Sequence, residues 1–313
     1  MSETGPLFVS SGDLIADRRY KWALDQAARG DFAAAAEILV QTVALAPAFA
    51  TAWFALGTIR ERLGDRTGAI AALENARDAD PADYHGARLQ LARLASGDAT
   101  PAMSETYVRR LFDQYAGRYD VALTERLAYR GPALLREAVA TVMTAAGRKL
   151  RFGSMLDLGC GTGLAGAAFR PLVDWLIGVD LAPAMIAQAQ TKGLYDRLVT
   201  ADIAAFLADA ANNAARHHLV VAADVFVYVN DLAPAVTGVA RVLAPDGVFA
   251  FTVETYEGDC VKLLPTLRYA HGAPYIHRTL ADAGLRPDSV RNAAVRSEKG
   301  VPVDSLVVVA QPA

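Results

Sequence analysis

The chain has 313 residues, of which 53% are hydrophobic and 21% are charged, and its formal net charge is −3. Such a composition can bury a core, which excludes a disordered chain, and the length predicts about two domains. The acidic balance lacks the positive charge of a dedicated nucleic-acid-binding protein. The two cysteines, Cys160 and Cys260, argue against a disulfide framework or a zinc cluster.

The N-terminal stretch "MSETGPLFVSSGDL" contains no basic segment followed by an apolar one, so we expect no signal peptide. Charges or prolines interrupt every long apolar run before the ~18 residues that a membrane helix needs. We therefore expect a soluble, cytoplasmic protein without a membrane partner.

The first third of the chain repeats itself. The Gly-Asp pair at 30–31 recurs 34 positions later, at 64–65. Alanines at matched positions let paired helices approach closely, and prolines end the second helix of each pair. The pattern resembles the tetratricopeptide repeat, although an ordinary helical bundle with a coincidental period is an alternative. The resemblance implies an N-terminal segment (1–15) and a small all-α domain (16–96) with repeats at 16–49 and 50–83 and a capping helix.

Residues 97–105 are polar and contain glycine and proline, which predicts a linker. Residues 106–150 have helical periodicity. From residue 151 onward, short β-rich runs alternate with alanine-rich helices, which predicts an α/β fold with a mostly parallel sheet covered on both faces. The last two strands have no helix between them and predict an antiparallel hairpin. The expected strands are 153–158, 174–179, 196–200, 217–222, 247–253, 290–296 and 303–310.

The stretch "MLDLGCGTGLAG" joins the first expected strand to a helix. Gly159, Gly161 and Gly163 lie at two-residue spacing and allow the backbone to turn sharply and approach a ligand. Asp180 ends the next expected strand, 21 residues after Gly159, where a carboxylate can accept both ribose hydroxyls of an adenosine. Leu164 takes the place of the third glycine of a dinucleotide-binding loop, which disfavours a nicotinamide oxidoreductase.

The pattern D-x-G-x-G-x-G that begins at Asp157 resembles the first motif of class I S-adenosylmethionine-dependent methyltransferases. Four later stretches resemble further motifs of that family in the expected order: "VDLAPAMIAQAQ", "VTADI", "HHLVVAADVFVYVNDL" and "VARVLAPDGVFAFTVE". The resemblance implies a methyltransferase domain (106–313) with a Rossmann-like core (151–313). Its seven-stranded sheet would have the order 3-2-1-4-5-7-6 with the seventh strand antiparallel.

The same resemblance implies S-adenosylmethionine as the cofactor. The implied cofactor-binding residues are Asp157, close to the ammonium group; Gly159, Gly161 and Gly163 in the turn; Asp180 on the ribose, followed by Leu181; Met185 and Ile203 beside the adenine; and Asp202 on the adenine amine.

The segment "LFDQYAGRYDVAL" lies in the helical region 106–150 and resembles the lid of small-molecule members of this family. The resemblance places Tyr115 and Tyr119 beside the methionine half of the cofactor; plain packing is the alternative. His271 lies after the fifth expected strand, and loops at the carboxyl ends of strands line substrate pockets. We predict that His271 contacts the substrate or acts as a general base, with a structural role as the alternative. No metal site is expected.

These features indicate a methyltransferase that transfers a methyl group by in-line displacement to an unidentified acceptor, which we expect to be a small molecule. One alternative is methylation of a protein bound by the repeats, which offer a site for a protein partner. Another is a catalytically silent interaction module, which the retained cofactor motifs disfavour. Nucleic acid is not expected as the acceptor, because "AADV" stands where amino methylases of nucleic-acid bases carry an Asn-Pro-Pro-Tyr-type motif.

Overall fold

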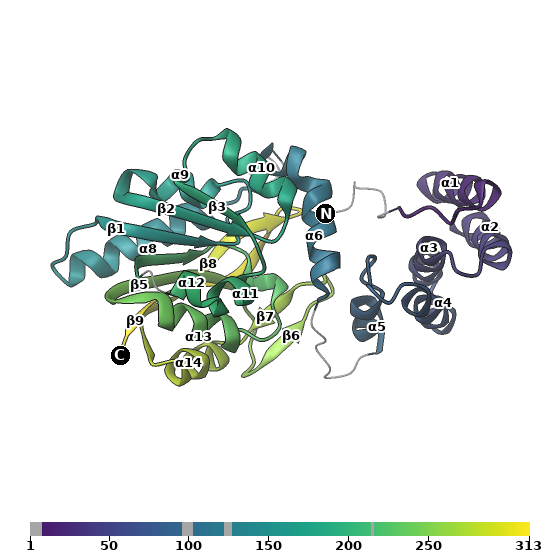
Figure 1. Cartoon of the computed structure of the whole chain (residues 1–313). Helices are drawn as coiled ribbons and strands as arrows, with labels where there is room; N and C mark the ends of the chain where they lie inside the picture. Colours follow the sequence, from purple (N-terminus) through teal and green to yellow (C-terminus); the bar gives the residue numbers. More distant parts are fainter. Residues whose placement is uncertain (1–7, 96–102, 122–126, 214–215) are drawn as a thin grey trace. The chain divides into compact units, whose positions relative to one another are not determined.

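The computed structural model describes residues 8–95, 103–121, 127–213 and 216–313 (Figure 1). The chain divides into two compact units, Met1–Leu111 and Phe112–Ala313. Most of the expected linker at 97–105 and part of the expected N-terminal segment at 1–15 lie outside the described residues.

Helical hairpins make up the first unit. Each of two hairpins turns at a glycine with positive φ, Gly30 at +87° and Gly64 at +81°. The next residue, Asp31 or Asp65, caps the following helix by accepting a hydrogen bond from the amide three residues on, which satisfies a donor that the helix leaves unpaired. The 34-residue period of the sequence therefore corresponds to two helical hairpins with equivalent turns. The assignment of these hairpins as tetratricopeptide repeats stays a prediction. The helices are α1 (Leu14–Ala28), α2 (Phe32–Leu45), α3 (Ala50–Arg62), α4 (Arg66–Ala79) and α5 (Ala87–Ala95).

Helices precede the sheet of the second unit. They are α6 (Glu105–Tyr115), which crosses the division between the units, the 3₁₀ turn η1 (Ala116–Arg118), α7 (Tyr119–Val121) and α8 (Gly131–Ala145). Strands and helices then alternate: β1 (Phe152–Leu158), α9 (Leu164–Phe169), β2 (Val173–Asp180), α10 (Pro183–Thr191), β3 (Arg197–Thr200), α11 (Ile203–Ala208), α12 (Ala210–Asn213), β4 (His217–Ala222), the 3₁₀ turn η4 (Phe226–Tyr228), α13 (Ala233–Val242), β5 (Leu243–Glu254), β6 (Val261–Leu263), β7 (Tyr269–His271), α14 (Ala273–Asp282), β8 (Leu285–Glu298) and β9 (Val301–Pro312).

The described residues form a nine-stranded sheet whose traced order is β3-β2-β1-β4-β5-β7-β6. In addition, β9 pairs with β5 and β8 pairs with β9, both antiparallel. The seven predicted strands are all present, and the predicted terminal hairpin is confirmed as β8–β9. The predicted count of seven is wrong, because the insertion after β5 adds β6 and β7. These two strands are three residues each and too short to show a periodicity in the sequence.

The short strand β7 extends the carboxyl edge of the sheet. Ala270 of β7 pairs with Glu254 at the end of β5, and Glu254 also pairs with Ser305 of β9. Because β9 occupies one side of β5, β7 lies on the other side, beyond the last β4–β5 pair, Ala222↔Phe251. The insertion therefore brings its residues beside the exit loop of β4.

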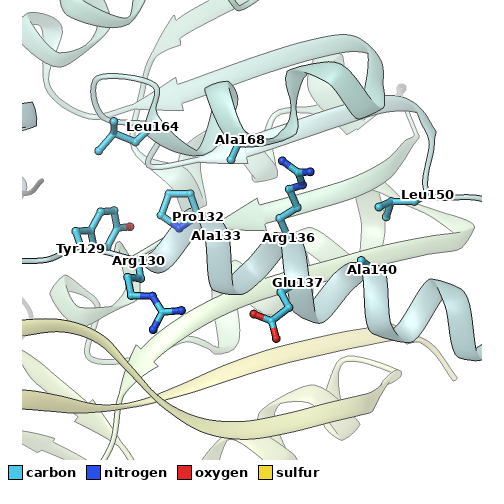
Figure 2. Close-up of a pocket in the computed structure, with 10 residues that line it drawn as sticks. All are labelled: Tyr129, Arg130, Pro132, Ala133, Arg136, Glu137, Ala140, Leu150, Leu164 and Ala168. Atoms are coloured by element: carbon cyan, nitrogen blue, oxygen red, sulfur yellow. The ribbon is translucent and has the colours of Figure 1, made fainter.

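One face of the sheet is covered by α8 and α9. Leu135 and Val139 of α8 pack with Phe169 of α9 over the buried strand residues Met155 and Val221. Between the two helices is a cavity of about 550 Å³ (Figure 2). Its lining is mainly apolar and includes Tyr129, Arg130, Pro132, Arg136, Leu150 and Leu164.

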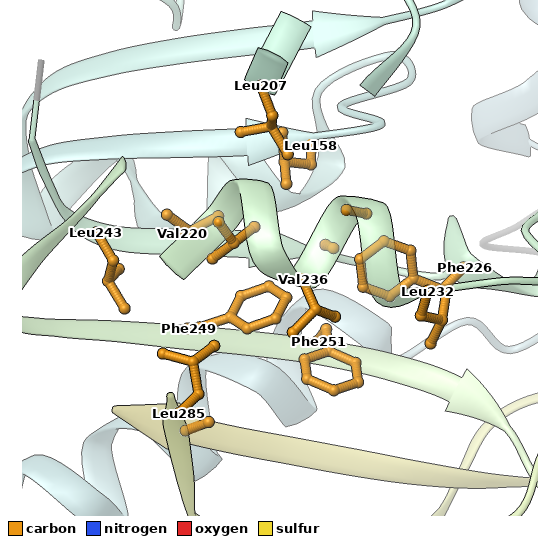
Figure 3. Close-up of a cluster of buried hydrophobic side chains, with 14 of the residues drawn as sticks. Leu158, Leu207, Val220, Phe226, Leu232, Val236, Leu243, Phe249, Phe251 and Leu285 are labelled. Atoms are coloured by element: carbon orange, nitrogen blue, oxygen red, sulfur yellow. The ribbon is translucent and has the colours of Figure 1, made fainter. Parts of the chain in front are cut away.

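Helices α11, α13 and α14 cover the opposite face. Figure 3 shows Phe226, Phe249 and Phe251 gathered under α13, with the rings of Phe249 and Phe251 stacked at 4.7 Å. Burying each such side chain stabilises the fold by roughly 1.5–3 kcal/mol. Both faces of the central strands are therefore buried under helices. Polar groups can be placed at the edge formed by the ends of the strands.

Candidate active site

The turn after β1 bends through three glycines with positive φ, namely +66° at Gly159, +53° at Gly161 and +95° at Gly163. A side chain at Gly159 would collide with Val225, since a Cβ there would lie 2.3 Å from Val225 Cγ2. The close approach joins the glycine turn to the exit loop of β4, so the packing requires glycine at position 159, while the positive φ favours glycine at all three positions.

Asp180 at the end of β2 binds this turn directly. Its Oδ2 accepts from the Gly161 amide at 2.8 Å and its Oδ1 accepts from the Ala182 amide at 2.8 Å. Burial raises the pKa of Asp180 from 3.8 to about 6, although both amides oppose the shift. A carboxylate predicted to hold a ribose therefore lies beside the glycines.

Asp157 of β1 is completely buried beneath the turn. Its Oδ2 accepts from the Tyr195 hydroxyl at 2.6 Å, and its Oδ1 has no hydrogen-bond partner among the described residues. Burial, aided by the charge of Asp180, raises the pKa of Asp157 from 3.8 to about 7. The free oxygen leaves Asp157 able to accept from one more donor.

The raised pKa of Asp157 predicts a stability that falls with rising pH. Between pH 4 and pH 7 the folded chain keeps a proton that the unfolded chain releases, so this contribution is full below pH 4 and is lost as pH rises through about 7. Urea unfolding at pH 5 and pH 8 should therefore show a smaller pH-dependent loss in Asp157→Asn than in the unchanged chain. The exposed Asp246→Asn serves as the control, and an identical loss in all three chains would contradict the assignment.

The predicted lid packs against the turn and α10. Tyr115 and Tyr119 lie in one apolar cluster with the fully buried Met185, and the Tyr119 ring lies 3.8 Å from the place of a Cβ on Gly161. Asp113 of α6 accepts from the Ala184 amide at 2.9 Å. The structure therefore brings both lid tyrosines to Met185 and Tyr119 to the glycine turn.

A second tie comes from Asp120 of α7. Its carboxylate accepts from the Thr162 hydroxyl of the glycine turn and from Lys192 Nζ, the latter at 2.6 Å. The segment 112–121 is thus fixed at two points to the elements that carry the predicted cofactor residues.

The remaining predicted cofactor residues follow β2 and β3. Leu181 is half-buried between Asp180 and Ala182. Asp202 caps α11 by accepting from the Ala205 amide at 2.8 Å, and Ile203 packs against the core of the α13 face. All of these residues lie at the carboxyl ends of parallel strands, the edge where ligands bind in open α/β sheets.

His271 of β7 is completely buried. Its Nε2 lies 3.0 Å from the Val229 carbonyl oxygen and donates to it, while Nδ1 has no partner among the described residues. Burial lowers the pKa of His271 from 6.5 to about 4. The histidine therefore holds the exit loop of β4 as a neutral side chain, and the structure places it beneath that loop.

Sequence reasoning missed a buried ion cluster at the same edge. Arg296 of β8 is only 2% exposed; its Nη1 donates to both oxygens of Asp224, at 2.5 and 2.7 Å, and its Nη2 donates to Glu254. Arg268 and Glu298 complete this Arg296 cluster through a further ion pair. Asp224, two residues after the end of β4, has a positive φ of +57°, which is strained for a residue with a side chain.

Aromatic side chains join the Arg296 cluster to the lid. The Tyr228 ring packs edge-on against Phe112 at 5.0 Å, and Phe112 packs against Tyr119 at 6.0 Å. The charges of Asp180 and Asp224 both contribute, after burial, to raising the pKa of Tyr119. The Phe112 ring therefore connects Tyr119, which lies beside Gly161, to Tyr228. Among the described residues no group of histidine, cysteine and carboxylate side chains is arranged to hold a metal ion.

Part of the second unit matches a known protein family. Residues 156–251 match the model of a protein family described as "Methyltransferase domain". None of the curated proteins matches the sequence. Within the described residues, every helix is too short or too polar to cross a membrane.

Many solved structures are similar to the chain. The 1,6-didemethyltoxoflavin-N1-methyltransferase of Burkholderia thailandensis is 20% identical, with a TM-score of 0.51 over 69% of this chain and 93% of that chain. The N-methyltransferase NodS of Bradyrhizobium japonicum is 18% identical, with a TM-score of 0.49 over 65% and 97%. A methyltransferase of Clostridium acetobutylicum is also 18% identical, with a TM-score of 0.48 over 64% and 99%. Only the first score exceeds 0.5, and it supports the fold alone. The second unit therefore has the fold of Rossmann-like methyltransferases, and its residues 156–251 match the methyltransferase-domain family.

Proposed function

We propose that the protein is an S-adenosylmethionine-dependent methyltransferase. The observation that carries the proposal is the pairing of Asp180 with the Gly161 amide, directly above the buried Asp157. S-adenosylmethionine has an adenosine with two ribose hydroxyls and a methionine end with an ammonium group. The site offers a carboxylate for each of these ends.

The donors and acceptors present fit this cofactor. Asp157 Oδ1 is buried and has no partner within the part of the chain that the structure describes, which suits an ammonium donor. The absence of side chains on the three glycines leaves backbone that a ligand can approach. We propose that Asp180 and Leu181 contact the ribose, that Met185 and Ile203 flank the adenine, and that Asp202 accepts from its amine.

Methyl transfer does not require the protein to form a covalent bond with either reactant. When bound, the cofactor would supply an electrophilic methyl group to a lone pair of the acceptor, with its sulfur as the leaving group. The protein aligns the acceptor and excludes water. We propose that Tyr115 and Tyr119 exclude water from the methionine end of the cofactor, which the packing of both tyrosines with Met185 of α10 supports.

We propose a small molecule as the acceptor. The lid is tied down on both sides by Asp113 and Asp120, which favours an enclosed site over a surface that receives a protein. A protein acceptor held by the helical unit, as tetratricopeptide repeats would provide, is the second candidate, favoured by the paired hairpins. Incubation with methyl-labelled S-adenosylmethionine and a cell extract separates the two, since the label enters either the low-mass or the protein fraction.

We also propose, from the composition of the chain, that the reaction takes place in the cytoplasm.

The test of the cofactor is a thermal titration with S-adenosylmethionine, S-adenosylhomocysteine and NAD. A ligand at ~100 times its dissociation constant stabilises the folded state by ~2.7 kcal/mol. We expect this stabilisation with the two sulfur ligands only, and its loss in Asp180→Ala. The control is Asp174→Ala, at the opposite end of the same strand, which should keep it. Stabilisation by NAD alone would contradict the proposal.

We propose that His271 acts at the part of the site where the methyl acceptor binds. His271→Ala should lower turnover of the labelled acceptor while leaving the cofactor titration unchanged, because its contact is with the β4 exit loop and not with the glycine turn. His271→Asn keeps an N–H donor for the Val229 carbonyl. If His271→Asn keeps activity and His271→Ala loses it, the histidine has a positioning role. If both variants lose activity, it acts as a base. Full turnover in His271→Ala would refute both roles.

A further inference from the structure

A tyrosine outside all of the predicted motifs contacts the buried Asp157. Tyr195 lies two residues before β3, and its hydroxyl donates to Asp157 Oδ2 at 2.6 Å. The next residue, Asp196, ties the backbone to β2: its amide donates to the Leu176 carbonyl at 2.9 Å, and its Oδ2 accepts from the Leu176 amide at 2.7 Å. The backbone that carries Tyr195 is therefore anchored to the sheet.

Glycines make the space that the Tyr195 ring occupies. A Cβ at Gly163 of the glycine turn would lie 3.0 Å from Tyr195 Cε2, and a Cβ at Gly178 of β2 would lie 2.8 Å from Cε1. A Cβ at Gly166 of α9 would collide with the hydroxyl oxygen itself. Three separate elements therefore lack a side chain where they contact this tyrosine, so the ring is held in one place and its hydroxyl stays on Asp157.

The contact with Tyr195 determines which oxygen of Asp157 remains for a ligand. Because Oδ2 is bonded to the hydroxyl, the carboxylate cannot turn freely about its Cβ–Cγ bond. The buried Oδ1, which has no partner in the part of the chain that the structure describes, therefore keeps one direction. A group that a neighbouring hydrogen bond already holds in place does not have to be ordered when a ligand binds.

The donor to Asp157 is also a neutral one. Burial, followed by the charge of Asp157, raises the pKa of the Tyr195 hydroxyl well above its usual value of 10, so the hydroxyl keeps its proton and remains a donor. It satisfies Oδ2 without cancelling the negative charge of Asp157, whereas a lysine or arginine in its place would repel an ammonium group. The bond also opposes the effect of burial on the pKa of Asp157, because a hydrogen bond to a carboxylate favours the ionised form.

We infer that Tyr195 is a positioning residue for the cofactor, which holds the Asp157 carboxylate so that Oδ1 binds the ammonium group. The inference rests on the proposed function and deepens it, because recognition of the methionine end then depends on two residues instead of Asp157 alone. Tyr195 acts through Asp157, so we expect its effect in the affinity for ligands that carry an ammonium group.

The test compares two ligands by isothermal titration calorimetry with the full-length chain. S-adenosylhomocysteine has the ammonium group, whereas 5′-methylthioadenosine keeps the adenosine and the sulfur but lacks the amino-acid end. Tyr195→Phe keeps the ring and removes the hydroxyl. We expect it to weaken S-adenosylhomocysteine about tenfold, which corresponds to ~1.4 kcal/mol, and to bind methylthioadenosine as the unchanged chain does. The control Tyr256→Phe, which removes a hydroxyl 3.1 Å from Cys260 Sγ, should leave both affinities unchanged.

The pH dependence gives a readout that a loss of packing would not move. The titratable groups that face Asp157 are Asp180 of β2, Cys160 of the glycine turn, Tyr129 before α8 and Tyr195. Because the Tyr195 hydroxyl favours the ionised carboxylate, Tyr195→Phe should raise the pH at which acidification weakens S-adenosylhomocysteine relative to methylthioadenosine. Taking the ratio of the two affinities removes the titration of Asp180, whose proposed contact is with the ribose that both ligands carry.

A second variant displaces the hydroxyl instead of removing it. The added Cβ of Gly166→Ala collides with the Tyr195 hydroxyl, so this variant should also weaken S-adenosylhomocysteine selectively, and it decides the matter if Tyr195→Phe binds neither ligand. In an Asp157→Asn chain, Tyr195→Phe should have no further effect. Equal weakening of both ligands, or unchanged binding of S-adenosylhomocysteine, overturns the inference alone. An unchanged chain that binds neither ligand overturns the proposed function, and the inference with it.

Discussion

Replacing Arg296 by methionine is expected to lower the free energy of unfolding by about 3–5 kcal/mol, because it leaves buried carboxylates without their cation. Glu254 is 3% exposed and loses its Nη2 partner, and Asp224 loses the Nη1 group that bridges both of its oxygens. Burial raises the pKa of Glu254 even with both arginines present. The measurement is urea unfolding at neutral pH, followed by circular dichroism.

The matched control is Arg151→Met. Arg151 pairs with Asp174 on the surface, with its side chain 63% exposed, and such pairs contribute about 0–1 kcal/mol. A double variant, Arg296→Met with Glu254→Gln, should recover part of the loss, because it removes the negative charge of Glu254 that Arg296→Met leaves buried without a cation. A loss for Arg296→Met as small as that for Arg151→Met would mean that water reaches the cluster and that it is no buried network.

The reason that the Arg296 cluster escaped sequence reasoning is its dispersion along the chain. Its members come from the exit loop of β4, the end of β5, the insertion and the terminal hairpin, at positions 224 to 298. No local spacing relates them, and each alone is an ordinary charged residue. Only the pairing of β5 with β9 and of β9 with β8 brings them together. The positive φ of Asp224 could not be predicted either, because the local sequence "AADV" contains no residue that requires it.

The cofactor edge could be predicted because its signals are local. Three glycines within five residues, an acidic residue at the end of the next strand and alternating strands and helices are all consequences of short-range backbone geometry. His271 shows the limit of such reasoning. The sequence placed it correctly after the fifth strand, but its burial beneath the β4 exit loop depends on β7, a strand too short to predict.

Replacing Gly159 by alanine is expected to lower the free energy of unfolding of the second unit through two separate effects. At φ +66° any L side chain is strained, at a cost of roughly 1–2 kcal/mol. The added Cβ would also lie 2.3 Å from Val225 Cγ2, and such overpacking costs typically about 1–3 kcal/mol more. Unfolding of Gly159→Ala should therefore show the sum of both, and the titration with S-adenosylmethionine should lose its stabilising effect as the turn moves.

Gly147→Ala separates the two costs. Gly147 has the same φ of +66°, but a Cβ there meets nothing within 4 Å, so this variant should show the backbone cost alone and keep cofactor binding. Adding Val225→Ala to Gly159→Ala removes the two methyl groups but leaves the Val225 Cβ at 2.7 Å, so it should restore only part of the lost stability. If the two glycine variants lose equal stability, the close approach of the glycine turn to the β4 exit loop is absent in solution. If instead Gly159→Ala alone is severe and Val225→Ala partly rescues it, this contact sets the shape of the turn on which the cofactor is proposed to bind.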